Sequence, residues 1–173
     1  MPVSPSTGKA ARSGVAACSA KVPNRALTVL AMALLSTARI AVRYLSFERV
    51  GRTLGVRCST GGAAASARIE AGQLARAQSL ARAMARAAHR LPGESRCLPQ
   101  AIALTWMLRF AGIPSRLVIA MHRVDRMADH GFHAWVECGD LVVIGACNQS
   151  DYHRLSEFEH ISGPLLKEAE HLG

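Results

Sequence analysis

The sequence has little lysine, no closely spaced pair of cysteines and no glycine-rich phosphate loop. Lysine occurs only at Lys9, Lys21 and Lys167, so the net charge of +9 comes almost wholly from arginine. This basic excess favours acidic partners, whether a peptide, a nucleic acid or an anionic membrane surface, without choosing among them. Because no GxxxxGK(S/T) pattern is present, we expect no cofactor here and any ATP requirement in a partner protein.

The cysteines are odd in number and spread along the chain: Cys18, Cys58, Cys97, Cys138 and Cys147. They form no CxxC pair and no framework spacing, which excludes the usual pattern of a disulfide-stapled secreted domain. We therefore expect reduced thiols in a cytoplasmic protein. No pair has the close spacing of a structural zinc site, so no metal ion is expected.

An apolar run near the amino terminus resembles a secretory signal but departs from it. Residues 26–35 are apolar. The basic segment before them, residues 1–24, is long for a secretory signal and is expected to form a disordered tail. Arg39 and Arg43 interrupt the apolar pattern before the roughly 18 to 20 residues that a membrane span needs. We expect an amphipathic helix over about residues 25–47, docked on its own domain. Contact of this helix with a membrane surface is the less favoured interpretation.

Residues 25–90 are interpreted as a helical extension. Residues 51–65 are rich in Gly, Ser, Thr and Ala and indicate a connection, while residues 66–90 show the apolar spacing of a second helix. Arginines four positions apart share one face of that helix: Arg82, Arg86 and Arg90. A solvated face explains them better than a nucleic-acid surface, so no nucleic acid partner is expected.

Residues 91–173 are expected to form the core domain, with one helix followed by strands. Pro92 and Gly93 end the preceding helix, and Ser95 is placed to cap a helix that runs to Phe110. Short runs of branched apolar residues predict strands over residues 116–121, 132–138 and 141–145. A hairpin turn at Gly139-Asp140 joins the last two. A helix that leads into an antiparallel sheet predicts an α+β fold.

Cys97 differs from the other cysteines because it lies in the first turn of the core helix. Unpaired backbone amides and the helix dipole stabilise a thiolate there, and Arg96 adds positive charge. A thiolate that attacks an amide also needs a base that later protonates the leaving amine, and histidine suits neutral pH. His133 begins a strand and has a fixed facing within the sheet. We therefore predict Cys97 as nucleophile and His133 as its base.

A third group normally accepts the other ring proton of such a histidine. The predicted hairpin places His133 opposite Ala146 or, with a shift of one residue, Gly145, and neither has a side chain that accepts a proton. Asn148 and Asp151 lie just past the strand and could fold back. Asp151 is the first choice for the third catalytic residue, and Asn148 is the other candidate.

Several short runs between residues 90 and 156 share the pattern of one known family. The runs are Arg96-Cys97-Leu98, Leu108-Arg109, Gly112-Ile113-Pro114, Leu117-Val118-Ile119, His133-Ala134-Trp135-Val136-Glu137, Val142-Val143-Ile144-Gly145 and the residues from Tyr152 to Leu155. Together they resemble the stand-alone leader peptidases of lasso peptide biosynthesis, the B2 proteins, which have a transglutaminase-like fold. The combination is specific, although no single run is.

The resemblance implies a papain/transglutaminase-like core in which Cys97 and His133 cut the leader from a ribosomally made precursor, without a metal. It implies three partners: the lasso precursor peptide, a small winged-helix protein that recognises the leader, and an ATP-using cyclase similar to asparagine synthetase that closes the macrolactam ring. Family members often carry an aspartate shortly after the second strand motif. This sequence has Gly145 and Ala146 there.

Two other functions are compatible with the residues. A transglutaminase-like acyl transferase would use the same cysteine and histidine but resolve its thioester with an amine instead of water. A non-catalytic module would bind RNA or an acidic leader through the arginine face and would leave Cys97 as a buried thiol.

Overall fold

The computed structural model describes residues 24–58, 69–93, 96–124 and 131–160. Most of the expected tail, the Ser95 cap and the segment after residue 160 lie outside the described residues. The elements in chain order are α1 (Asn24–Tyr44), α2 (Phe47–Leu54), β1 (Val56–Cys58), α3 (Ala71–Arg90), α4 (Cys97–Phe110), β2 (Ser115–His122), β3 (Phe132–Cys138), β4 (Leu141–Ile144), the 3-10 turn η1 (Gln149–Asp151) and β5 (Tyr152–His160).

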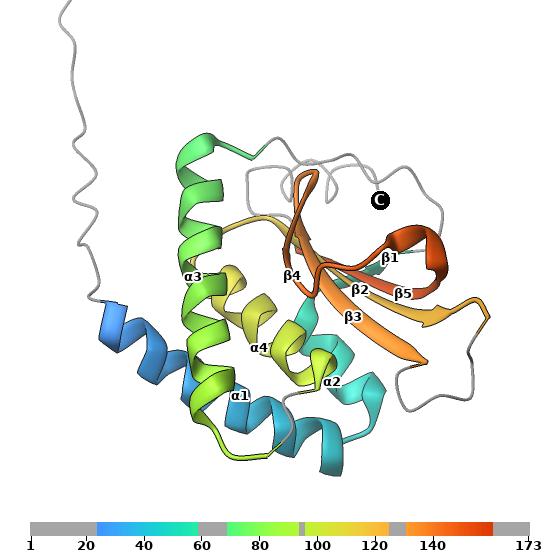
Figure 1. The fold of residues 1–173 in the computed structure, drawn as a ribbon, viewed down its shortest axis with the longest axis horizontal. Coiled ribbons are helices and arrows are strands. Elements are labelled where there is room, and N and C mark those ends of the chain that lie inside the picture. Colours follow the sequence, from blue (N-terminus) through green and yellow to red (C-terminus); the bar gives the residue numbers. More distant parts are fainter. Residues whose placement is uncertain (1–23, 59–68, 94–95, 125–130, 161–173) are drawn as a thin grey trace, which may run out of the picture.

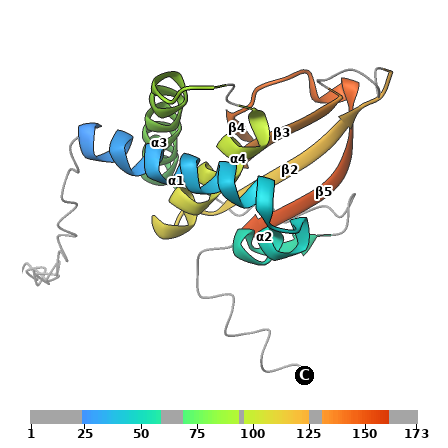
Figure 2. The same ribbon diagram turned by 90° about the horizontal axis from the view of Figure 1, so that it is seen from below.

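The described strands form one five-stranded antiparallel sheet in the order β1-β5-β2-β3-β4. The helices gather on one side of this sheet (Figures 1 and 2). The helix α4 packs directly against β2 and β3, and α1 and α3 pack against α4. This arrangement confirms the expected α+β fold, with the cysteine-bearing helix laid on an antiparallel sheet.

The amino-terminal segment differs in detail from the expectation. The predicted helix over residues 25–47 is two helices, because Ser46, the N-cap residue of α2, has extended backbone (φ −63°, ψ 144°), although its side chain makes no capping hydrogen bond. The predicted connection over residues 51–65 contains the end of α2 and the edge strand β1, whose Val56 pairs with Glu159 of β5. A three-residue strand is too short to leave a period in the sequence, and only its long-range pairing defines it.

The sequence does not predict strand β5, because charged residues occupy its middle. Arg154 lies 2.9 Å from Glu137 of β3, and Glu159 lies 3.5 Å from Arg116 of β2. Arg154 also lies over the ring of the buried Trp135, 5.6 Å from its centroid, and the Trp135 Nε1–H donates to Glu137 at 2.7 Å. These cross-strand partners compensate the burial of charge, so the strand forms without an apolar alternation.

The two faces of β3 have different surroundings. Ala134 and Val136 belong to the main core between the sheet and the helices. Trp135 belongs to a second, smaller cluster on the opposite face. The ring of His133 lies 6.1 Å from the Trp135 ring, so the histidine projects on this second face.

The expected arginine face on α3 is divided in the structure. Arg86 is half-buried, and its Nε–H donates to the Thr28 hydroxyl of α1 at 3.2 Å. Arg82 is exposed and donates to Ser79 on its own helix. Arg86 therefore joins two helices of the fold, and a continuous basic surface is not formed by the three arginines.

Candidate active site

Cys97 is the first residue of α4. Arg96 precedes it as the N-cap residue with extended backbone (φ −60°, ψ 149°) and makes no side-chain capping hydrogen bond. The amides of the first helical turn have no partner within the helix, so they remain directed at groups near the thiol. Pro99 is buried in the same turn, where its missing amide hydrogen costs little. The expected placement of Cys97 at a helix start is confirmed.

The thiol of Cys97 has an environment that favours its ionised form. Burial raises the pKa of the thiol, but hydrogen bonds with the His133 side chain and with the backbone of Ala134 and Leu98 outweigh burial, so the pKa lies below its ordinary value. A thiolate is therefore populated at lower pH than for an exposed cysteine.

The pKa of His133 is shifted in the opposite direction to that of Cys97. Its hydrogen bond with Cys97 raises the pKa of the imidazole, burial opposes this effect, and the Gly145 carbonyl adds to the increase. A lowered thiol pKa and a raised imidazole pKa both favour the thiolate–imidazolium pair over the neutral pair. The structure thus brings together the two residues that the sequence singled out, in a state suited to nucleophilic attack.

The second ring nitrogen of His133 contacts a main-chain group. Its Nε2 lies 2.9 Å from the carbonyl oxygen of Gly145, directly after β4. When Nε2 donates this hydrogen bond, Nδ1 is the nitrogen left to exchange a proton with Cys97. The Gly145 carbonyl therefore occupies the place of the third catalytic group. The sequence offers Gly145 opposite His133 only as the shifted alternative to Ala146, and no side chain of Gly145 signals its role.

The two side chains expected to serve as third member lie elsewhere. Asn148 Nδ2 donates to Asp151 Oδ2 at 2.9 Å, and Ser150 bridges both residues from within the same turn. Asn148 and Asp151 are both exposed. In the part of the chain that the structure describes, neither makes a hydrogen bond with His133.

Aromatic rings surround the histidine. The Tyr152 ring lies 5.4 Å from His133 and 6.3 Å from Trp135, and the His122 ring meets Tyr152 edge to face at 5.1 Å. The sequence gives Tyr152 no role at the site, because the strand β5 is not predicted from it. Aromatic rings therefore pack beside the imidazole, whose hydrogen bond with Gly145 is partly buried.

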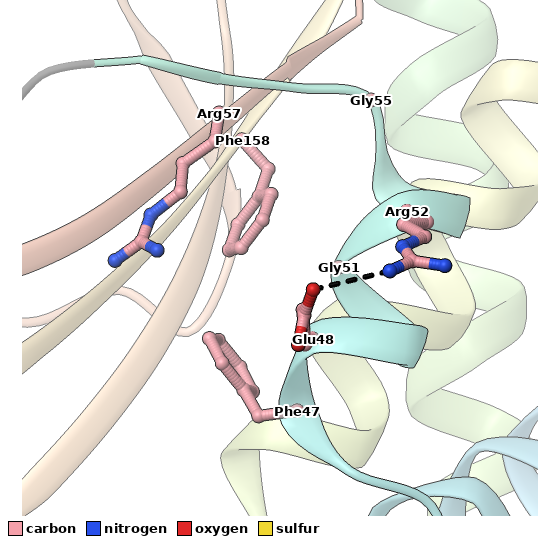
Figure 3. Close-up of a pocket in the computed structure, with 7 residues that line it drawn as sticks. All are labelled: Phe47, Glu48, Gly51, Arg52, Gly55, Arg57 and Phe158. Atoms are coloured by element: carbon pink, nitrogen blue, oxygen red, sulfur yellow. Dashed lines mark hydrogen bonds and ion pairs between the residues drawn. The ribbon is translucent and has the colours of Figure 1, made fainter.

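A separate pocket lies between α2 and β5 and has a volume of about 290 Å³ (Figure 3). The rings of Phe47 and Phe158 meet across it, 5.7 Å apart, and Arg52 pairs with Glu48 on its rim at 3.1 Å. Phe158 is six residues along β5 from Tyr152, which corresponds to about 20 Å of strand. This pocket is therefore distinct from the site around His133.

Within residues 24–58, 69–93, 96–124 and 131–160, no group of three or more His, Cys, Asp or Glu side chains is placed to hold a metal ion. The absence of a metal from the reaction stays a prediction of the sequence.

A helix-start cysteine hydrogen-bonded to a strand histidine, on an antiparallel sheet covered by helices, defines a papain-type cysteine enzyme core. The family model described as the transglutaminase-like superfamily matches residues 30–157, well over half of the chain, and this span includes both Cys97 and His133. The chain belongs to the transglutaminase-like superfamily, whose members are generally cysteine hydrolases and transferases. No curated protein and no solved structure matches it.

The shifted pKa of Cys97 predicts selective alkylation. At neutral pH, iodoacetamide is expected to modify Cys97 at least about tenfold faster than Cys58, Cys138 or Cys147. Burial raises the pKa of each of these three thiols, in Cys138 to about 12. Because the pKa of Cys97 is lowered, its alkylation should stay fast as the pH decreases and should slow only at a pH below that at which an ordinary thiol slows. Mass spectrometry of the labelled peptides over a pH series measures this, and equal rates for all four thiols would refute the activated thiolate.

Asn148 and Asp151, which bond to each other at the η1 turn, are predicted to be dispensable for catalysis. Asp151→Ala and Asn148→Ala are each expected to change the activity of the purified chain by less than about tenfold, since neither residue contacts His133. Removal of a true orienting carboxylate costs about ten thousandfold in kcat. A loss above a hundredfold for Asp151→Ala, with the fold intact by circular dichroism, would return Asp151 to the catalytic set.

Proposed function

We propose that this protein is a cysteine peptidase that removes the leader from a ribosomally made lasso peptide precursor before macrolactam closure. The hydrogen-bonded pair of Cys97 and His133 at the start of α4 is the observation that carries the proposal. Membership of the superfamily supports the class of chemistry. The proposed substrate rests on the sequence runs around both residues, which resemble those of lasso leader peptidases.

The reaction follows from the positions of these groups. The Cys97 thiolate attacks the carbonyl of the last leader residue, so that a carbon–sulfur bond forms and the carbon–nitrogen bond to the core peptide breaks. His133 gives its proton to the departing core amine, and the leader stays on Cys97 as a thioester. Water, deprotonated by His133, then attacks the thioester, and the leader leaves with a carboxylate while the thiol is restored. First-turn amides of α4 are placed to donate to the oxyanion in both steps.

The Gly145 carbonyl has a positioning role in this scheme. It accepts the Nε2–H of His133 and holds the imidazole in the tautomer whose other nitrogen faces the thiol. It is uncharged, so it stabilises the imidazolium less than a carboxylate does. A modest turnover suits an enzyme that acts once on each precursor, delivered to it by partners.

The proposed partners are the precursor, a small winged-helix protein that recognises the leader, and an asparagine-synthetase-like cyclase, all in the cytoplasm. Such a winged-helix domain needs strands of its own. Before α3, β1 is the only strand among the described residues, and it pairs into the main sheet. Recognition of the leader is therefore assigned to a separate protein, and any use of ATP to the cyclase.

Acyl transfer to an amine is the competing activity, because the same dyad forms the same thioester. The experiment is incubation of the purified chain with candidate precursor peptides encoded nearby, with and without the small recognition protein, and with the Cys97→Ala chain as control. We expect a separated leader and core, much faster with the recognition protein and absent with the variant. Products that contain only amide-linked adducts, with no separated core, would overturn the peptidase assignment.

A further inference from the structure

One side of α1 is apolar and faces outward. This helix lies along the outside of the helical layer (Figure 2). Ala31, Leu35 and Ala38 on its inner side are fully buried in the main core. The exposed residues Ala26, Val29, Leu30, Ala33, Ile40 and Tyr44 lie on one side of the helix at its 3.6-residue period, with the exposed Thr37 between Ala33 and Ile40. We call this set of apolar residues the outer stripe of α1.

The side chains of the outer stripe are strongly exposed. Val29 is 66% exposed, Leu30 48%, Ile40 60% and Tyr44 75%. The stripe is about 27 Å long at the helical rise. An exposed apolar surface of this length normally contacts a partner or a membrane.

The serine and threonine hydroxyls of α1 already have hydrogen-bond acceptors within the helix. Thr28, Ser36 and Thr37 each donate the side-chain hydroxyl to the carbonyl four residues earlier, at 2.9, 2.9 and 3.0 Å. Protein interfaces usually carry a hydrogen bond for every 100–200 Å² or so of buried area. Thr37, whose exposed hydroxyl lies between Ala33 and Ile40 of the stripe, is thus satisfied within the helix, and this suits the hydrocarbon edge of a bilayer better than the surface of a protein.

The charge around α1 has one sign. Residues 1–47 contain Lys9, Arg12, Lys21, Arg25, Arg39 and Arg43 but no Asp or Glu. Arg25 and Arg43, near the two ends of α1, are exposed. Basic residues beside an apolar helical face are complementary to anionic lipid headgroups. α1 is also long and apolar enough to cross a membrane by length and composition alone, but its inner side is packed in the folded core.

We propose that the outer stripe of α1 docks the folded protein on the surface of an anionic lipid bilayer. The helix lies flat, with the stripe at the level of the acyl chains and Arg25 and Arg43 at the headgroups. The fold stays intact, because only the outward side of α1 enters the interface. The stripe contains neither Cys97 nor His133, so the proposal stands apart from the catalytic one.

Flotation of the purified full-length chain with lipid vesicles tests the docking. The probes are vesicles of phosphatidylcholine alone and of phosphatidylcholine mixed with phosphatidylglycerol. The chain is expected to float with the anionic vesicles, and less so as salt rises. Leu30→Glu combined with Ile40→Glu is expected to lower the bound fraction at least about tenfold, because two exposed apolar side chains are lost.

The matched control combines Gln78→Glu with Ala85→Glu. Both residues are exposed on α3, and the pair changes the net charge by the same amount as the stripe variant. The control should float like the unchanged chain, and both variants should keep the far-ultraviolet circular dichroism and the cleavage activity of that chain. Failure of the unchanged chain to float, equal loss in both variants, or a concentration-dependent dimer that only the stripe variant disrupts would each overturn the proposal.

Discussion

Replacement of Cys97 by alanine is expected to lower leader cleavage by at least about a thousandfold while leaving the fold unchanged. Among the cysteines that the structure describes, Cys97 is the one hydrogen-bonded to His133 and the one whose pKa is lowered by its contacts. The side chain is only half-buried, so its truncation should alter the free energy of unfolding by no more than about 1 kcal/mol. Cleavage is measured by mass spectrometry, and folding by thermal unfolding.

Cys147→Ala is the matched control, because Cys147 is also a half-buried thiol and lies beside the cluster that contains Trp135. This variant should retain most of the activity. His133→Ala should lose cleavage as Cys97→Ala does, and it should also slow the alkylation of Cys97, since the hydrogen bond that lowers the thiol pKa is removed. Rapid alkylation of Cys97 in the His133 variant would show that the histidine does not activate the thiol.

Replacement of Gly145 by alanine is expected to lower activity by about ten- to a hundredfold, because the carbonyl that orients His133 is displaced but not removed. Gly145 has φ +74°, and a Cβ there would lie 2.5 Å from the Ala134 carbonyl oxygen and 3.0 Å from Trp135. The end of β4 must shift to admit it. The carbonyl that accepts the Nε2–H of His133 shifts with it.

The readout that separates positioning from simple destabilisation is the pH profile of Cys97 alkylation. In Gly145→Ala the profile should move toward that of an ordinary thiol, because His133 is no longer held beside Cys97. Gly72→Ala is the matched control, since a Cβ at Gly72, in the first turn of α3, meets nothing within 4 Å. It should be neutral or stabilising by about 0.4–1 kcal/mol. A folded Gly145→Ala chain with full activity and an unchanged profile would remove Gly145 from the site.

The helix that carries Cys97 and the hairpin that carries His133 could be predicted from the sequence, because local signals define both. Pro92, Gly93 and Gly112 mark the helix limits, and the turn at Gly139 fixes the hairpin register. That register placed His133 opposite Ala146 or, with a shift of one residue, Gly145, whereas in the structure a bulge between Val136 and Glu137 pairs Val136 with Ile144. What it could not show is that the backbone carbonyl is the acceptor, since every residue has one and no residue type signals its use.

The edge of the sheet could not be predicted in the same way. β1 is too short to leave a period, and β5 is held by ion pairs between residues far apart in the chain, such as Arg116 with Glu159. Without β5, Tyr152 could not be placed beside His133. The chemistry of Asp151 and its nearness in sequence favour it as the third residue, but in the structure it accepts a hydrogen bond from Asn148.

The most direct test of the account is cleavage of the precursor in water enriched in oxygen-18, with acid-quenched samples analysed for intact mass. At short times, the leader is expected to be attached to Cys97 as a thioester. The account then predicts a leader with one oxygen-18 in its terminal carboxylate and a core with an unmodified amine. Leader joined to amines without the heavy isotope, or labelled leader released equally well by the Cys97→Ala chain, would contradict the assignment of Cys97 as the nucleophile of a peptidase.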